Sequence, residues 1–317
     1  MNNKRNINIG EKMNKIFLAV TLAVFSVSIS FGAFSSNDKG TSAAQFLKLG
    51  AGARAAAMGD AASALSSDST DIYWNPAGLS NITGKGSMSV MHAVWFEDIS
   101  YDWASYAMPY KNWGVFGLGV QYLSYGNIKK ADNTGLETGD FSPTDLCVSL
   151  SYARNIKGIA LGANAKYISQ KITNSAVAYA VDLGAQYKTN DKLTLGLAVQ
   201  NIGTKIKFVN EEDPLPFNVK VGGAYALKDN WLAVLDINAP IDSEVNVGAG
   251  TEYNYKIKEK LDIFGRAGYN TRNIKTGGLN GLTTGVGIKY MDYSFDYAFV
   301  PYGKLGNTQR LSLSIKF

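Results

Sequence analysis

The sequence contains a single histidine, His92, and a single cysteine, Cys147. A Cys/His metal site needs several such ligands, so this chain cannot build one, and a lone cysteine excludes a disulfide within the chain. A Ser-His-Asp triad would have to use His92, which lies inside a strand-like run, 87–97, with no nucleophile motif nearby. We interpret His92 as a packing or rim residue and Cys147 as a small buried side chain. These residues predict no enzyme, no metal site and no cofactor.

Gly50, Gly52 and Ala55 match the loose glycine pattern of dinucleotide-binding loops. Such a loop needs a preceding strand and a parallel α/β unit around it, and this part of the sequence predicts neither, so we reject the match. The formal net charge is +5, and no cluster of Lys and Arg suggests nucleic-acid binding.

A further set of charged residues, with mixed signs, recurs on one side of strand-like segments. The set comprises Lys166, Asp182, Lys220, Asp236, Glu252, Arg266, Lys289, Asp296 and Arg310. Each would cost up to a few kcal/mol if it faced lipid at the membrane midplane, so we expect these side chains to face the interior of a barrel. Ion pairs that fill the lumen are the favoured interpretation, and a ligand or ion path is the alternative.

The segments that carry these residues alternate between apolar and polar side chains. In 144–154, for example, Leu146, Val148 and Leu150 lie on one face, and Cys147 and Ser149 lie on the other. A period of two predicts strands with one apolar face. Charged residues make up only 18% of the chain, yet its mean hydropathy is −0.08, which is too low for a bundle of apolar helices.

We count fourteen such segments, each near the 9 to 11 residues that a tilted strand needs to cross a bilayer. They are 87–97, 99–109, 113–123, 144–154, 159–169, 178–188, 193–201, 217–227, 231–238, 244–254, 261–270, 282–290, 292–300 and 308–317. Short turns (110–112, 155–158, 189–190, 228–230, 256–260 and 291) alternate with connections that are usually longer. This sorting is typical of outer-membrane barrels, whose periplasmic turns are short. The sequence therefore predicts an all-β, transmembrane, antiparallel barrel.

The N-terminus predicts export. Lys15 precedes an uncharged apolar run over 16–29, which is shorter than the roughly 20 residues of a spanning helix, and small residues follow it. We predict a signal peptide over 1–33, cleaved after Ala33, with an uncleaved anchor as the alternative; Met1 or Met13 is the start. At the other end, Leu311, Leu313, Ile315 and Phe317 share one face of the last strand.

Residues 41–82 differ from the strands, because an Ala-rich stretch there suits a short helix or turn. Asn75 before Pro76 suits a helix start, with Asn as the cap and Pro in the first turn, and Gly78 is expected to end that helix after about one turn. We expect 34–82 to form a plug or periplasmic segment and 83–317 to form the barrel.

The block FLKLGAGARAAAMGDAASALSSDSTDIYWNPAGLS resembles the start of the PorV/PorQ family of outer-membrane barrels. Its NPAGL element is similar to the wider FadL-like group of long-chain fatty-acid transporters. The resemblance implies a fourteen-stranded barrel with the N-terminal segment folded into or beneath the lumen. It implies a plug turn formed by Asn75, Pro76, Ala77 and Gly78, and an N-terminal motif that includes Gly50, Gly52, Arg54, Met58 and Gly59. A pairing of Arg54 with an acid in the lumen is a hypothesis. Phe317 resembles the terminal aromatic residue by which outer-membrane proteins are recognised for assembly.

Three functions follow from the pattern and the resemblance. Passage of a hydrophobic small molecule across the outer membrane is the first, and an accessory role in type IX protein secretion is the alternative. A general porin or a structural barrel is the third. The expected partners are outer-membrane lipid, the barrel assembly machinery, a hydrophobic ligand and components of a secretion system.

Overall fold

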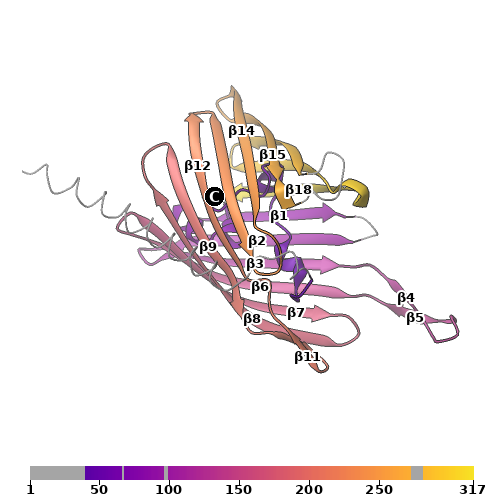
Figure 1. Ribbon diagram of the computed structural model, residues 1–317. Helices are drawn as coiled ribbons and strands as arrows, with labels where there is room; N and C mark the ends of the chain where they lie inside the picture. Colours follow the sequence, from indigo (N-terminus) through magenta and orange to yellow (C-terminus); the bar gives the residue numbers. More distant parts are fainter. Residues whose placement is uncertain (1–39, 66–67, 96–98, 273–280) are drawn as a thin grey trace, which may run out of the picture.

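The computed structural model describes residues 40–65, 68–95, 99–272 and 281–317. The predicted signal peptide, 1–33, lies outside these ranges. Antiparallel strands close into a fourteen-stranded barrel, so the predicted fold class is confirmed (Figure 1). In chain order the barrel strands are β1 (Ser87–Val94), β2 (Ser100–Tyr110), β3 (Gly114–Ser124), β6 (Thr144–Ile156), β7 (Ile159–Lys171), β8 (Ser175–Lys188), β9 (Leu193–Gly203), β12 (Asn218–Lys228), β13 (Trp231–Pro240), β14 (Asn246–Lys258), β15 (Leu261–Asn270), β16 (Leu282–Tyr290), β17 (Tyr293–Pro301) and β18 (Asn307–Lys316).

The barrel closes between its first and last strands. β1 pairs with β18 in a continuous antiparallel register from Ser87↔Lys316 to Val94↔Gln309. Closure leaves no strand edge with unpaired backbone groups, which is the condition for β-structure in lipid. β1 ends at Val94, earlier than the predicted 97. β6 and β7 continue to Ile156 and Lys171, two residues beyond their predicted ends.

The two ends of the barrel differ. One end, called here the turn end, carries the short turns, the start of β1 and the C-terminal Phe317. The other, the loop end, carries the longer connections. Two of these contain hairpins that the sequence did not predict: β4 (Ile128–Ala131) with β5 (Glu137–Phe141), which projects from the barrel in Figure 1, and β10 (Ile206–Phe208) with β11 (Glu211–Asp213). A short helix, η5 (Gly303–Leu305), lies in another.

The plug, defined as residues 40–82, occupies the lumen. Its helices are η2 (Gln45–Lys48), α2 (Ala53–Ala57), α3 (Asp71–Trp74) and η3 (Pro76–Asn81). It begins at the loop end, where the Ala43 amide donates to the Pro214 carbonyl at 2.9 Å, and it leads at the turn end into β1. None of the helices in the described ranges has the length and apolar character to cross a membrane.

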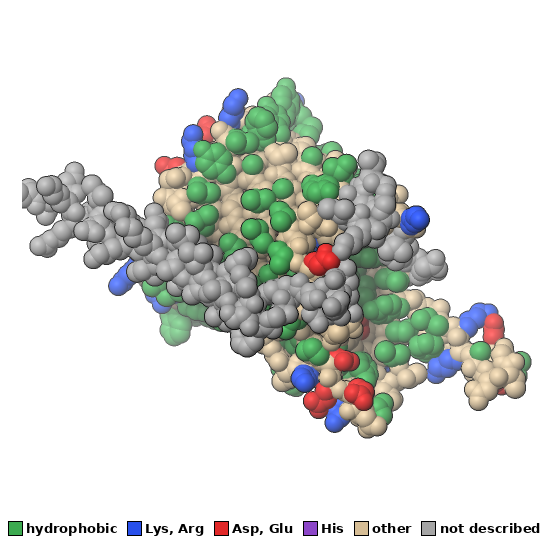
Figure 2. Space-filling model, in the orientation of Figure 1, with side chains coloured by type: hydrophobic (Ala, Val, Ile, Leu, Met, Phe, Trp, Pro, Cys, Tyr) green, Lys and Arg blue, Asp and Glu red, His purple; other side chains and the backbone are tan. Residues whose placement is uncertain are grey.

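The two faces of the wall follow the alternation of the strands. Large apolar side chains such as Leu150, Val286 and Phe295 point outward and are half or more exposed. Figure 2 shows hydrophobic side chains spread over the outer wall, with charged side chains mainly toward its margins. On β8 and β12, inward positions carry small or polar side chains such as Ala178, Asp182 and Gly222, so the plug can lie close to the wall there.

Candidate functional site

The plug is tied to the wall by a chain of alternating charges. Arg54 of α2 donates through Nε and Nη2 to the two carboxylate oxygens of Glu252 on β14, at 2.8 and 2.7 Å. Arg266 on β15 donates to Glu252 Oε2 at 2.6 Å and to Asp296 Oδ1 on β17 at 2.7 Å. Bidentate, charge-assisted bonds of this kind are among the strongest in proteins. The structure thus brings Arg54 of the plug motif together with three of the charged residues singled out in the strands.

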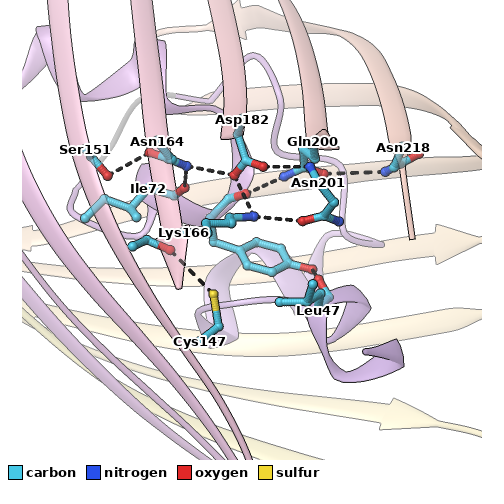
Figure 3. A network of polar contacts seen from close by, with 12 residues as sticks. Leu47, Ile72, Cys147, Ser151, Asn164, Lys166, Asp182, Gln200, Asn201 and Asn218 are labelled. Atoms are coloured by element: carbon cyan, nitrogen blue, oxygen red, sulfur yellow. Dashed lines mark hydrogen bonds and ion pairs between the residues drawn. The ribbon is translucent and has the colours of Figure 1, made fainter. Parts of the chain in front are cut away.

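A second polar group surrounds Asp182 on β8. Lys166 Nζ lies 2.6 Å from Asp182 Oδ2 and donates to Asn201 Oδ1 at 2.9 Å. Asn164 donates to Asp182 at 2.9 Å and to the Ile72 carbonyl of the plug at 2.7 Å (Figure 3). Both members of the ion pair are buried, and its remaining bonding positions are filled by amides, as a buried pair requires.

Asp236 on β13 holds the middle of the plug. Its Oδ2 accepts the backbone N–H groups of Ala62 and Ser63 at 3.0 and 2.8 Å, and its Oδ1 accepts the Ser63 hydroxyl at 2.8 Å. The Asn75 side-chain amide donates to the Ser63 carbonyl at 2.7 Å, while its oxygen accepts the Ala77 N–H at 3.1 Å and so caps η3.

The expectation that Gly78 ends this helix after one turn is wrong, because η3 continues over Pro76–Asn81. A Cβ at Gly78 would lie 2.8 Å from the Asp71 carboxylate. Glycine at this position therefore permits close packing of η3 against the side chain of Asp71, and it has no role in termination.

At several glycines of the wall, the plug lies so close that a Cβ atom would clash with it. A Cβ at Gly268 would lie 2.3 Å from the Gly59 amide nitrogen, and a Cβ at Gly250 would lie 2.5 Å from Met58. At Gly184, it would meet the Asn75 side chain at 2.1 Å. The plug backbone therefore rests where the wall has no side chain.

At the loop end, η2 is fixed by a loop carboxylate. Lys48 Nζ and Gln45 Nε2 donate to Asp242 Oδ2 at 2.6 and 2.7 Å. Burial disfavours the charged carboxylate, but the hydrogen bonds from Lys48 and Gln45 outweigh it and lower the pKa of Asp242 below its ordinary value. Nearby, Arg272 pairs with Asp60 at 2.8 Å.

Within the described residues, a cavity lies on either side of the plug. The cavity at the loop end has a volume of about 230 Å³ and is lined by Tyr73 and Trp74 of the plug and by Lys220 and several Asn and Gln side chains. The cavity at the turn end has a volume of about 320 Å³, and Leu65 and Gln186 contribute to its lining. The plug thus separates two chambers of one lumen.

The remaining sequence-predicted residues are distributed around the plug. Arg310 is buried and donates to the Gly50 carbonyl at 3.1 Å, and Lys289 lines a pocket at the turn end. The Gly52 amide lies 3.1 Å from Met91 Sδ. Phe317 lies at the turn end beside Tyr106. Pro76 is buried at the first position of η3.

Several ionisable residues form pairs that the sequence did not predict. Asp242 and Arg272 lie in loops, where alternation gives no signal. His92 and Asp102 form a 2.7 Å pair on the outer face of β1 and β2. Pairing the predicted segments 87–97 and 99–109 about residue 98 would have set His92 opposite Ala104, whereas the observed register is shifted by two residues and sets it opposite Asp102.

Comparison with known proteins gives the chain a family. The profile described as "Type IX secretion system protein PorV" matches residues 34–242. The chain belongs to the PorV family. No curated protein matches its sequence.

Solved structures share the architecture of this PorV-family barrel. The toluene transporter TodX of Pseudomonas putida is 14% identical, with a TM-score of 0.58 over 84% of this chain and 96% of TodX. The toluene transporter TbuX of Ralstonia pickettii is 13% identical, with a TM-score of 0.56 over 84% of this chain and 98% of TbuX. A FadL homologue of Pseudomonas aeruginosa is 12% identical, with a TM-score of 0.50 over 81% and 96% of the two chains. At these identities the likeness establishes the fold, which is that of an outer-membrane barrel.

Proposed function

We propose that this barrel passes a hydrophobic small molecule across the outer membrane, with the plug as its gate. The observation that carries the proposal is a lumen divided by the plug into two chambers, one at each end. Two barrels of the same architecture are named as toluene transporters, and the proposal extends that chemistry to this chain.

Passage requires the plug to move, because its backbone lies against the wall at positions without side chains. The contacts that hold it are hydrogen bonds and ion pairs from exchangeable side chains, among them the Arg54–Glu252–Arg266–Asp296 chain. Removal of the Glu252 charge leaves Arg54, whose side chain is 25% exposed, without its carboxylate partner, whereas Arg266 keeps Asp296. Loss of Glu252 should therefore shift the plug toward a displaced state.

Uptake of radiolabelled toluene tests the proposal in cells that lack their own FadL-type transporter. Cells with the wild-type barrel should take up toluene faster than empty-vector cells, and Glu252→Gln should increase the rate further. Glu137→Gln is the matched control, because it breaks the exposed Lys129–Glu137 pair of the β4–β5 hairpin. Assembled wild-type barrel with no uptake above empty vector, or with a steady ionic conductance in planar bilayers, would contradict the proposal.

The proposal places the loop end outside the cell and the turn end in the periplasm, with export through the signal peptide predicted over 1–33. We expect no catalytic activity. The secretion role has the name of the family in its support, but no feature of the described lumen favours it. Normal export of cell-surface cargo in a deletion strain would count against that alternative.

A further inference from the structure

The buried cations in the described part of the lumen differ in whether they have a carboxylate partner. The four cationic side chains that are buried are Lys166, Lys220, Arg266 and Arg310. Lys166 and Arg266 have carboxylate partners at 2.6–2.7 Å. Arg310 donates to the Gly50 carbonyl and the Tyr302 hydroxyl. Within the described residues, no carboxylate lies within ion-pairing distance of Lys220, although the residue is only 5% exposed.

Aromatic faces surround the Lys220 ammonium. Its Nζ lies 4.5 Å from the centroid of the Trp74 ring and 5.4 Å from that of Tyr73. Cation–π contacts contribute about 0.5–2 kcal/mol, which offsets only part of the cost of burying a charge. An anion at this point would supply the missing interaction. The space for it is present, because Lys220 lines the 230 Å³ cavity at the loop end.

Two carboxylates lie near this ammonium without contacting it. Asp236 accepts three hydrogen bonds from Ala62 and Ser63. Asp60 pairs through Oδ2 with Arg272, while its Oδ1 is buried without a hydrogen-bond partner. The cavity lining contains the cations Lys48, Lys220 and Arg272 but only one acid, Asp60. Asp242 balances Lys48 from outside the lining. Among the described residues of this lining, Lys220 is therefore the cation that has no carboxylate in contact, and an anion in the cavity would give it one.

A neighbouring amide specifies a second group on the ligand. Asn218 precedes Lys220 by two residues on β12, so both side chains point into the lumen, roughly 7 Å apart along the strand. The Asn218 Oδ1 atom is buried and has no hydrogen-bond partner. It would accept a hydrogen bond from a hydroxyl on a ligand whose carboxylate meets Lys220.

We propose that the loop-end cavity is a binding site for a small hydrophilic carboxylate, such as a hydroxy acid, with Lys220 as its counter-ion and Trp74 and Tyr73 as its floor. The cavity is smaller than the roughly 300–1,000 Å³ of typical ligand pockets and its lining is rich in amides, so a short polar acid fits it better than a long acyl chain. The site lies in the loop-end chamber of the proposed passage, but binding of malate does not require that toluene passes the plug, so the uptake assay and the binding assay can fail independently.

Titration calorimetry on the purified full-length barrel tests the site, with malate as the short hydroxy acid and laurate as the amphipathic acid. Wild-type barrel should bind malate, and Lys220→Met should raise the dissociation constant at least about tenfold while its stem still covers the aromatic rings. Lys220→Gln is the second variant if Lys220→Met does not assemble. Lys289→Met is the matched control, because this lysine lines a different pocket at the turn end.

Three results would overturn the site. They are an absence of malate binding to the wild-type barrel, unchanged malate affinity in the Lys220 variants, and binding of laurate alone. In the last case, the ammonium would recognise a fatty-acid headgroup and not a small hydrophilic acid.

Discussion

His92 and Asp102 place two ionisable side chains on the outer wall, which otherwise presents apolar residues to the membrane. They are direct cross-strand partners on β1 and β2, joined at 2.7 Å, and about half of each side chain is exposed. Two other charged side chains on the outer face, Arg154 and Lys171, lie toward strand ends. In lipid, an ionisable group without its partner costs more than a mutually bonded pair.

A double-mutant cycle tests this coupling. Asp102→Leu or His92→Leu alone should destabilise the barrel, because each leaves the other polar group facing lipid, while the double variant should be as stable as the wild type or more stable. Denaturant unfolding from lipid bilayers measures the three differences. Additive losses in the double variant would show that the pair is not coupled.

The plug can dock against β15 because Gly268 has no side chain. Gly268→Ala should destabilise the docked plug by about 1–3 kcal/mol, because its Cβ would meet backbone atoms of Gly59 and Met58, which cannot move aside as a flexible side chain can. Gly265→Ala on the same strand is the control, since a Cβ there would have nothing within 4 Å. Limited proteolysis of the plug reports the difference, and equal protection in both variants would contradict the contact.

At the scale of elements, η2 depends on a single loop carboxylate, Asp242, whose pKa is lowered in the folded barrel. A depressed carboxylate pKa stabilises the folded state above the unfolded value of about 3.9, and this contribution is lost as the pH falls through the folded value. Wild type should therefore be more stable than Asp242→Asn near neutral pH, and the difference should shrink below about pH 4. Thermal unfolding of both proteins across this range measures it. A difference that stays constant with pH would mean that the charge of Asp242 is not what holds η2.

The sequence predicted elements better than it predicted contacts. A period of two marks the strands and their inward positions, because each strand carries that pattern within itself. The contacts of the plug join residues far apart in the chain, as Lys48 does with Asp242 and Gly59 with Gly268. No local pattern encodes such pairs. Lys220 shows the same limit, since its aromatic neighbours come from α3 and its lack of a carboxylate depends on the bonds that other acids make.

On the scale of the whole molecule, the C-terminus completes the wall at the turn end. The Phe317 amide donates to the Gly86 carbonyl at 3.1 Å, its carbonyl accepts the Gly86 amide at 2.8 Å, and its ring stacks on Tyr106 with centroids 6.1 Å apart. The residue therefore joins the last strand to the segment that leads into the first.

Deletion of Phe317 should lower the yield of assembled barrel several-fold, both because these contacts are lost and because the proposed signal for the assembly machinery is removed. Phe317→Tyr, which keeps the aromatic ring and the backbone bonds, should assemble normally. The heat-modifiable band on a denaturing gel measures assembled barrel. A deletion variant that assembles like the wild type would show that Phe317 is needed neither for these contacts nor as an assembly signal.

The path of the plug has a consequence for the order in which the barrel assembles. The chain runs through the lumen from Ala43 at the loop end to Gly86 at the turn end, inside a ring that β1 and β18 close. If the ring closed first, the N-terminal end would have to be threaded through it past wall positions that leave no room even for a methyl group. The segment synthesised first must therefore be in place when the strand synthesised last completes the ring.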